Sequence, residues 1–170
     1  YYIMQMTTNI YDKPDVAYAN TRIDDLKSLA KKALLDNQPV WFACDMGKDQ
    51  SSKLGMMASN LYDYDSMFKI RSKISKKDQV LYRDGVPNHA MVFVGVDLID
   101  DKPVKWMVEN SWGADKGSKG YWALYDNWFT QHVYCVIIHK DYLTDKLKKV
   151  FEQQPVVLPP WDPMYKAFVD

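Results

Sequence analysis

Two apolar runs in the second half of the chain have the length and composition of paired β-strands. Met91 to Asp97 reads M-V-F-V-G-V-D, and Val104 to Asn110 reads V-K-W-M-V-E-N. The stretch from Asp100 to Pro103 between them is typical of a turn. The pattern therefore predicts a β-hairpin. In such a hairpin His89, which opens the first run, and Asn110, which closes the second, lie at the same end of the sheet.

The remaining apolar positions predict an early helix, further strands and a late helix. Helical spacing runs from Ile23 to Leu34, with Asn20 or Thr21 as the cap and an end at residues 37–39. We expect its apolar face to pack on a sheet. The other predicted elements are a short strand and loop over 1–11, a buried strand over 40–44, a loop over 45–55, a short helix around 61–68, a charged helix or loop over 72–84, a glycine-bearing loop over 113–120, strands over 121–125 and 133–139, a helical turn around Trp128 and Phe129, and a surface helix over 141–154.

The predicted order is one early helix, then an antiparallel sheet with short connections, then a late helix and a tail. This order is typical of an α+β fold with a β-rich half. The tail from Pro155 carries four prolines and is expected to be extended.

Length and charge exclude several classes of protein. At 170 residues the chain has the size of one domain with a real core. Lys+Arg and Asp+Glu are 22 each, so nothing indicates a nucleic-acid footprint or an anionic-membrane surface. No apolar run approaches the roughly 20 residues that span a bilayer. The chain begins with Tyr1 rather than Met, so we expect it to start inside a longer gene product.

Aromatic residues make up 14% of the chain, which is high for this length. They favour either a tightly packed β core or an aromatic-lined cleft for peptide or sugar. An aromatic-rich carbohydrate-binding module is therefore one alternative, and composition does not decide between them.

His89 and Asn110 have the chemistry of the base half of a nucleophilic catalytic site. An amide oxygen that accepts from one ring N–H fixes the tautomer and aims the other nitrogen at a nucleophile. A neutral amide suits a cysteine nucleophile, because a thiolate–imidazolium pair needs an oriented cation and no second anion. A lone histidine at a strand edge is more often structural. Trp112, two residues beyond Asn110, is either a shield over this contact or a core residue.

The other histidines and the two cysteines have weaker claims to chemistry. His132 lies between a predicted helical turn and a strand, and His139 ends a strand. With Cys44 and Cys135 they show no metal-ligand spacing, so we predict no metal site and no cofactor. Both cysteines lie in apolar runs and are expected to be buried free thiols, with a disulfide as the lesser alternative. A reducing, cytoplasmic setting fits this best.

The motifs around His89 and Asn110 resemble those of papain-like cysteine peptidases. N-H-A-M-V-F-V-G-V, V-E-N-S-W-G and G-Y-W are similar to the His and Asn motifs of that superfamily. P-V-W-F-A-C-D-M-G-K, S-K-L-G, N-L-Y-D-Y and the terminal Q-P-V-V-L-P-P-W-D-P-M resemble the bleomycin hydrolase and aminopeptidase C family. The matching segments cover nearly the whole chain, which looks like the C-terminal part of such an enzyme.

The resemblance implies a papain-like fold, with a β-rich lobe over 1–154 and an extended arm over 155–170 that enters the active-site cleft. It implies that His89 is the general base, that Asn110 orients it and that Trp112 shields the pair. The arm would offer the carboxylate of Asp170 to the substrate amine. Substrates would be peptides with a free N-terminus, and the assembly a homohexamer. The nucleophilic cysteine and an oxyanion-hole glutamine would come from the N-terminal part of the same enzyme.

The sequence departs from the family pattern in two places. Neither Cys44 nor Cys135 lies in the Q-x-x-x-x-x-C-W setting of the family's nucleophile, so this chain alone is expected to be inactive. It ends in Y-K-A-F-V-D, whereas family members commonly end in a small-residue sequence. The alternative function is a non-catalytic binding or regulatory lobe, or a catalytically dead homologue.

Overall fold

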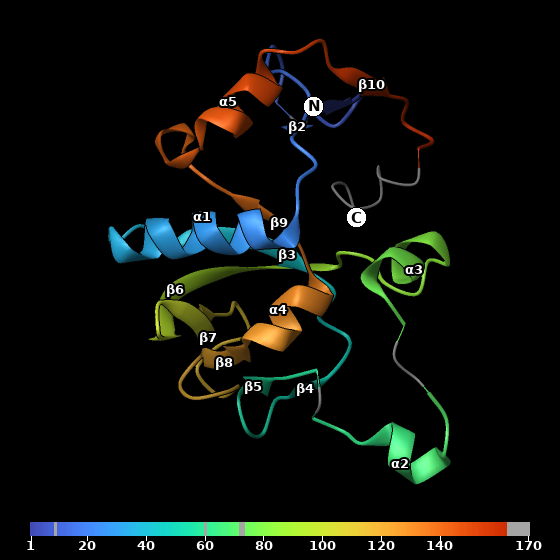
Figure 1. Cartoon of the computed structure of the whole chain (residues 1–170), viewed down its shortest axis with the longest axis vertical. Helices are drawn as coiled ribbons and strands as arrows, with labels where there is room; N and C mark the ends of the chain where they lie inside the picture. Colours follow the sequence, from blue (N-terminus) through green and yellow to red (C-terminus); the bar gives the residue numbers. More distant parts are fainter. Residues whose placement is uncertain (9, 60, 72–73, 163–170) are drawn as a thin grey trace.

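The computed structural model describes residues 1–8, 10–59, 61–71 and 74–162 (Figure 1). A curved sheet forms the body of the molecule, and its strands are antiparallel neighbours except for one parallel pair, β5 with β8. This is the predicted α+β arrangement. In spatial order the strands are β4 (Gln50–Ser51), β5 (Met56–Met57), β8 (Tyr121–Tyr125), β7 (Lys102–Glu109), β6 (His89–Ile99), β3 (Val40–Cys44) and β9 (Val133–Ile137).

A second, smaller sheet joins the two ends of the described chain. Its strands are β1 (Tyr2–Met4), β2 (Ala17–Tyr18) and β10 (Val156–Leu158), with β1 in the middle. β10 pairs with β1 in parallel, and β2 pairs with β1 in the antiparallel sense. The start of the Pro-rich tail is therefore extended, as predicted, but it is also hydrogen-bonded into a sheet that the sequence pattern did not predict.

The helices lie where the sequence pattern predicts them, but their first and last residues differ from the predicted ones. The prediction of Asn20 or Thr21 as the first cap is wrong, since Arg22 is the N-cap and the Thr21 hydroxyl donates to the Asp25 carboxylate instead. The predicted helix over 141–154 is interrupted, because the Thr144 hydroxyl caps a new helix by accepting from the Leu147 N–H at 3.3 Å. The helices are α1 (Ile23–Leu35), α2 (Tyr64–Phe68), α3 (Lys76–Leu81), α4 (Asp126–His132), the 3₁₀ turn η1 (Lys140–Tyr142) and α5 (Asp145–Phe151).

The predicted hairpin is confirmed as β6 and β7, and both strands are longer than expected. Asp100 and Asp101 alone make the turn, with φ of 49° and 61°, the left-handed values that a tight two-residue hairpin turn requires. Pro103 lies inside β7 rather than in the turn. Alternation along the two strands then places one set of side chains on the core side of the sheet: His89, Met91 and Phe93 from β6, and Trp106 and Val108 from β7, with Asn110 directly after it.

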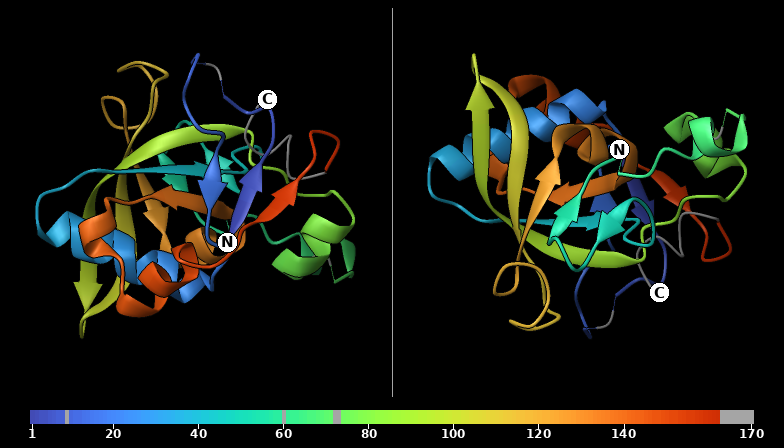
Figure 2. Two further views of the ribbon diagram at one scale, coloured as in Figure 1. Left: turned by 90° about the horizontal axis from the view of Figure 1, so that it is seen from above. Right: turned by 90° about the horizontal axis from the view of Figure 1, so that it is seen from below.

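An aromatic cluster fills the core under the sheet. The Phe42 and Phe93 rings stack with centroids 3.7 Å apart, and Phe93 also contacts Trp106 and Phe129 at 5.2 and 5.3 Å. α1 packs against β3, β6 and β9, and α4 packs against β7, β8 and β9 (Figure 2). A packed β core accounts for only part of the high aromatic content, because many other aromatic side chains, Tyr11, Trp41 and Trp161 among them, are exposed. None of the described helices combines the length and the apolar character needed to cross a bilayer.

Candidate active site

The ring of His89 is bound to the side-chain amide of Asn110. His89 Nε2 lies 2.9 Å from Asn110 Oδ1, and the same oxygen accepts from the backbone N–H of Ser111 at 2.8 Å. Two donors converging on one atom identify it as the amide oxygen, because the amide nitrogen accepts no hydrogen bonds. The His89 ring must therefore donate through Nε2.

This contact decides the state of the other ring nitrogen. A histidine whose Nε2 carries the proton keeps the lone pair on Nδ1 when it is neutral, and Nδ1 can then take a proton from a partner. Asn110 is 7% exposed, so its bond to the ring is shielded from water. The hydrogen bond thus fixes the orientation of the His89 ring, which is the geometry that a general base requires.

Trp112 covers this contact from the solvent side. Its ring centroid lies 5.0 Å from that of His89 at an interplanar angle of 32°, and it meets the buried ring of Trp122 edge-on at 5.7 Å. At 42% exposure Trp112 is not a core residue. The indole therefore contacts both the His89 and the Trp122 rings while part of it remains exposed.

Backbone hydrogen bonds hold the loop over 111–120, which carries Trp112, in position. The Asn110 N–H donates to Gly120 O at 3.1 Å, and the Gly117 N–H donates to Ser52 O at 3.3 Å. Gly117 has a φ of +64°, and a Cβ there would lie 2.5 Å from Tyr121 O. Only glycine fits this crowded left-handed position, so the loop can close tightly against its neighbours.

The segment before His89 is held by a residue that sequence reasoning missed. Asn88 donates its backbone N–H to Cys44 O at 3.0 Å, and its side-chain Oδ1 accepts from the Met46 N–H at 2.9 Å. Its Nδ2 donates to Asp45 Oδ1 at 3.2 Å. These partners lie more than 40 residues away in the sequence, so no local pattern could have indicated them.

Cys44 lies opposite His89 in the pairing of β3 with β6, but it has the properties of a core thiol. It is fully buried, and its Sγ donates to the His89 carbonyl oxygen at 3.7 Å. Burial, with the nearby Asp45 carboxylate, raises the pKa of the Cys44 thiol. Burial likewise raises the pKa of the half-buried Cys135. A nucleophilic cysteine needs a lowered pKa, so neither thiol is suited to attack.

His132 is a buried structural histidine at the end of α4. Its ring lies on Trp128 with centroids 4.7 Å apart, and its Nε2 is 3.5 Å from Asp49 Oδ2. Burial lowers the pKa of His132 to about 4, and the charges of Lys48 and Lys76 add to this effect. The fold therefore favours the neutral ring.

The lowered pKa of His132 predicts a loss of stability in mild acid. Because the unfolded ring titrates near 6.5, its contribution is complete above that pH and is lost as the pH falls from 6.5 through about 4. We expect the free energy of unfolding to fall by about 3 kcal/mol over this window, at 1.36 kcal/mol per pKa unit. Urea unfolding at a series of pH values measures it. In His132→Phe, which keeps an aromatic ring on Trp128, this part of the pH dependence should vanish; an unchanged slope would contradict the assignment.

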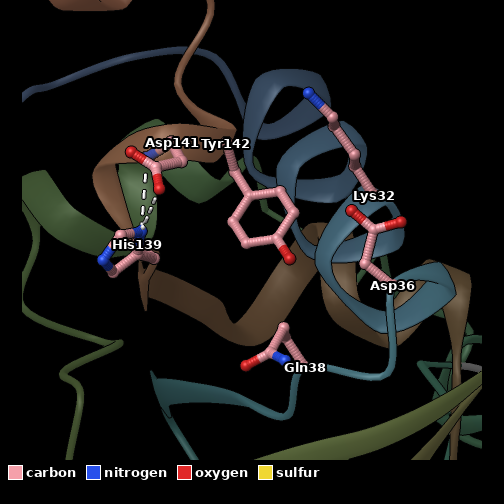
Figure 3. Close-up of a pocket in the computed structure, with 6 residues that line it drawn as sticks. All are labelled: Lys32, Asp36, Gln38, His139, Asp141 and Tyr142. Atoms are coloured by element: carbon pink, nitrogen blue, oxygen red, sulfur yellow. Dashed lines mark hydrogen bonds and ion pairs between the residues drawn. The ribbon is translucent and has the colours of Figure 1, made fainter.

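His139 lines a surface pocket far from His89. The pocket has a volume of about 400 Å³ and is lined from α1, from the residue two places before β3 and from η1 (Figure 3). His139 Nδ1 lies 3.3 Å from Asp141 Oδ2, and both side chains are mostly exposed. Gln38 in this pocket precedes the first residue of β3, whereas His89 pairs with the last, so the pocket and the His–Asn pair lie at opposite ends of the strand.

Two further predictions concern groups beyond the pair. Within the described ranges, no three His, Cys, Asp or Glu side chains are grouped so as to hold a metal ion. Asp170, to which the family resemblance gives the substrate amine as partner, lies outside the described residues, as does the arm from residue 163 onward.

Comparison with known proteins places the chain in a family. Residues 1–165 match the Peptidase C1-like family. The chain belongs to this family. Within it, the chain is 40% identical to aminopeptidase C of Lactobacillus helveticus over 92% of its own length and 38% identical to bleomycin hydrolase of Homo sapiens over 96%. The predicted resemblance is thus confirmed.

Solved structures give the fold of this Peptidase C1-like chain. The crystal structure of PepW from Lactobacillus rhamnosis superposes with a TM-score of 0.91 at 41% identity, over 96% of this chain and 37% of PepW. The predicted papain-like fold is confirmed, with the curved sheet as its β-rich lobe. The chain spans 35% of the length of the aminopeptidase C relative and 37% of the bleomycin hydrolase, so it corresponds to about a third of each.

Proposed function

We propose that this chain carries the general-base half of a cysteine peptidase site. The observation that supports this best is the hydrogen bond from His89 Nε2 to Asn110 Oδ1, which leaves Nδ1 to receive the proton of a thiol. His89 then acts as base and as imidazolium partner of the thiolate. Asn110 holds the ring, and Trp112 keeps water from their contact. The peptide bond is cut by acyl transfer through a thioester, without metal or cofactor.

The nucleophile in this proposal is not one of the two cysteines of this chain. Cys44 and Cys135 both have a raised pKa, so neither supplies a thiolate. The chain covers about a third of the length of its relatives. We assign the nucleophilic cysteine and the oxyanion-hole glutamine to the N-terminal part of the same enzyme, which docks against the end of the sheet where His89 lies. This chain alone would not hydrolyse peptides.

The proposed substrates are peptides with a free N-terminus. Relatives that align with nearly the whole of this chain include aminopeptidase C of Lactobacillus helveticus and of Streptococcus thermophilus. The C-terminal arm over 155–170 would supply the reason for this specificity: beyond its root at β10 it enters the cleft, and the carboxylate of Asp170 receives the substrate amine. The root of the arm is held by the pairing of β10 with β1, so the arm leaves the body from a fixed place. A homohexameric assembly and a cytoplasmic location belong to the same proposal.

An assay of the whole enzyme tests the proposal. An aminoacyl reporter with a free amine should be hydrolysed, its N-acetylated counterpart should be cut poorly, and a thiol alkylator should abolish both activities. The free amine matters because its charge is what the arm recognises.

Three outcomes would contradict parts of this proposal. Activity that survives alkylation would reject the cysteine mechanism, and equal cleavage of the acetylated reporter would reject the aminopeptidase assignment. No activity in a folded, whole protein would favour the non-catalytic lobe. Tryptophan fluorescence that shifts on addition of sugar would favour the carbohydrate-binding alternative.

A further inference from the structure

Asp45 is a buried carboxylate to which the proposed reaction assigns no role. It directly follows β3 and is 5% exposed. Its Oδ1 accepts from Asn88 Nδ2 at 3.2 Å and from the Gly47 N–H at 3.3 Å. A buried anion is retained at such a position only when its partners satisfy it.

Lys48 balances the charge of Asp45 and connects it to the segment before β6. Lys48 Nζ lies 3.7 Å from Asp45 Oδ2 and 2.7 Å from Asp84 Oδ2, and it also donates to the carbonyl oxygen of Asp84. The loop after β3 and the segment that leads to His89 are thereby joined by charge as well as by hydrogen bonds.

Asn88 is the point at which these contacts reach the active site. Its backbone N–H and both polar atoms of its side chain are bonded, to Cys44, Met46 and Asp45. His89 is the next residue, so these three bonds fix where its Cα lies at the end of the sheet. The side chain of Asn88 keeps its orientation because Asp45 accepts from one end of the amide while the Met46 N–H donates to the other.

We propose that Asp45 is a positioning residue for the peptidase site, acting through Asn88 to set the place of the His89 ring. This inference rests on the proposed function and adds a residue to it. Asn110 controls the rotation of the imidazole about its own bonds. Asp45 and Asn88 control the backbone from which the ring projects, and hence the distance from Nδ1 to an incoming thiol.

Loss of the Asp45 carboxylate should lower turnover rather than substrate binding. In Asp45→Ala the Asn88 side-chain amide and the Gly47 N–H lose their common acceptor, so the Asn88 side chain is free to turn. A displacement of the base of about 1 Å costs on the order of 100-fold in rate. Because Asp45 is buried, we expect it to make no contact with the substrate, so KM should stay near its original value.

The test compares variants of the whole enzyme on the free-amine reporter, with kcat scaled to the concentration of alkylatable active-site thiol. We expect kcat to fall on the order of 100-fold in Asp45→Ala with little change in KM. Asn88→Ala should show the same split, since it breaks the same connection. Asp45→Asn keeps an acceptor oxygen for Asn88 and should restore most of kcat. The matched control is Asp97→Ala, which removes an exposed partner of Lys105 from the same strand as His89 and should leave kcat unchanged.

The outcomes separate this inference from the proposed function. If the wild-type enzyme shows no activity that alkylation abolishes, the proposed function is wrong and this inference is wrong with it. With an active wild type, unchanged kcat in Asp45→Ala or in Asn88→Ala overturns the inference alone. So does a loss in Asp45→Asn as large as that in Asp45→Ala, or a loss that appears only as a lower melting temperature while kcat per thiol is kept.

Discussion

Replacing His89 by alanine in the whole enzyme is expected to lower kcat by about 10⁴-fold or more on the aminoacyl reporter. In the proposed mechanism, the substitution removes the group that takes the thiol proton and that later pairs with the thiolate. In the proposed site, the bond from Nε2 to Asn110 and the contact with Trp112 hold this ring in place, and neither can replace the lost base. Steady-state kinetics with alkylation of the residual activity measures the effect.

Two further substitutions make this prediction specific. His139→Ala removes an exposed histidine in the distant pocket and should leave kcat unchanged. Asn110→Ala should cost less than His89→Ala, because it loosens the ring and keeps the base. If Asn110→Ala proved the more damaging, the roles assigned to the two residues would be wrong.

Phe93→Ala is expected to cause the largest loss of stability, about 3–5 kcal/mol in the free energy of unfolding. Phe93 is fully buried on β6, and its ring contacts those of Phe42, Trp106 and Phe129. Truncation opens a cavity among rings that come from two other strands and a helix, which cannot all move inward together. Urea unfolding followed by tryptophan fluorescence reports the change.

The matched control is Phe68→Ala on α2. Phe68 is 60% exposed, and its truncation should change the free energy of unfolding by less than about 0.5 kcal/mol. A Phe93→Ala protein as stable as the Phe68→Ala protein would mean that the aromatic cluster does not hold the sheet together.

The central hairpin could be predicted because its two strands and its turn are neighbouring segments of the sequence. The two apolar runs that form β6 and β7 and the turn residues between them are visible in the sequence, and they suffice to bring His89 and Asn110 to one end. The meeting of these two side chains follows from the period of two along each strand. The same reasoning places both on the core side, since each shares its parity with buried residues.

Other features of the fold could not be predicted, because they depend on contacts between residues that are far apart in the sequence or on a single side-chain cap. β4 and β5 are two residues long each, too short to show alternation, and exist because they pair with one another and with β8. The late helix was predicted too long because leucines continue the helical spacing through Thr144, whose hydroxyl nevertheless starts a new helix. In the sequence, Asp45 and Asn88 look like ordinary polar loop residues. Their contact is formed only because the fold brings the end of β3 next to the start of β6.

The small sheet has a consequence for the order in which the molecule assembles. β1 pairs Tyr2 with Val156, so one of its partners is among the last strands of the described chain to be synthesised. The hairpin closes over a two-residue turn, whereas this parallel pair must bring opposite ends of the sequence together, and such long-range contacts form late. We expect the central sheet to be complete before the root of the arm is fixed. Molecules caught in between would have a finished His–Asn pair and an arm not yet anchored.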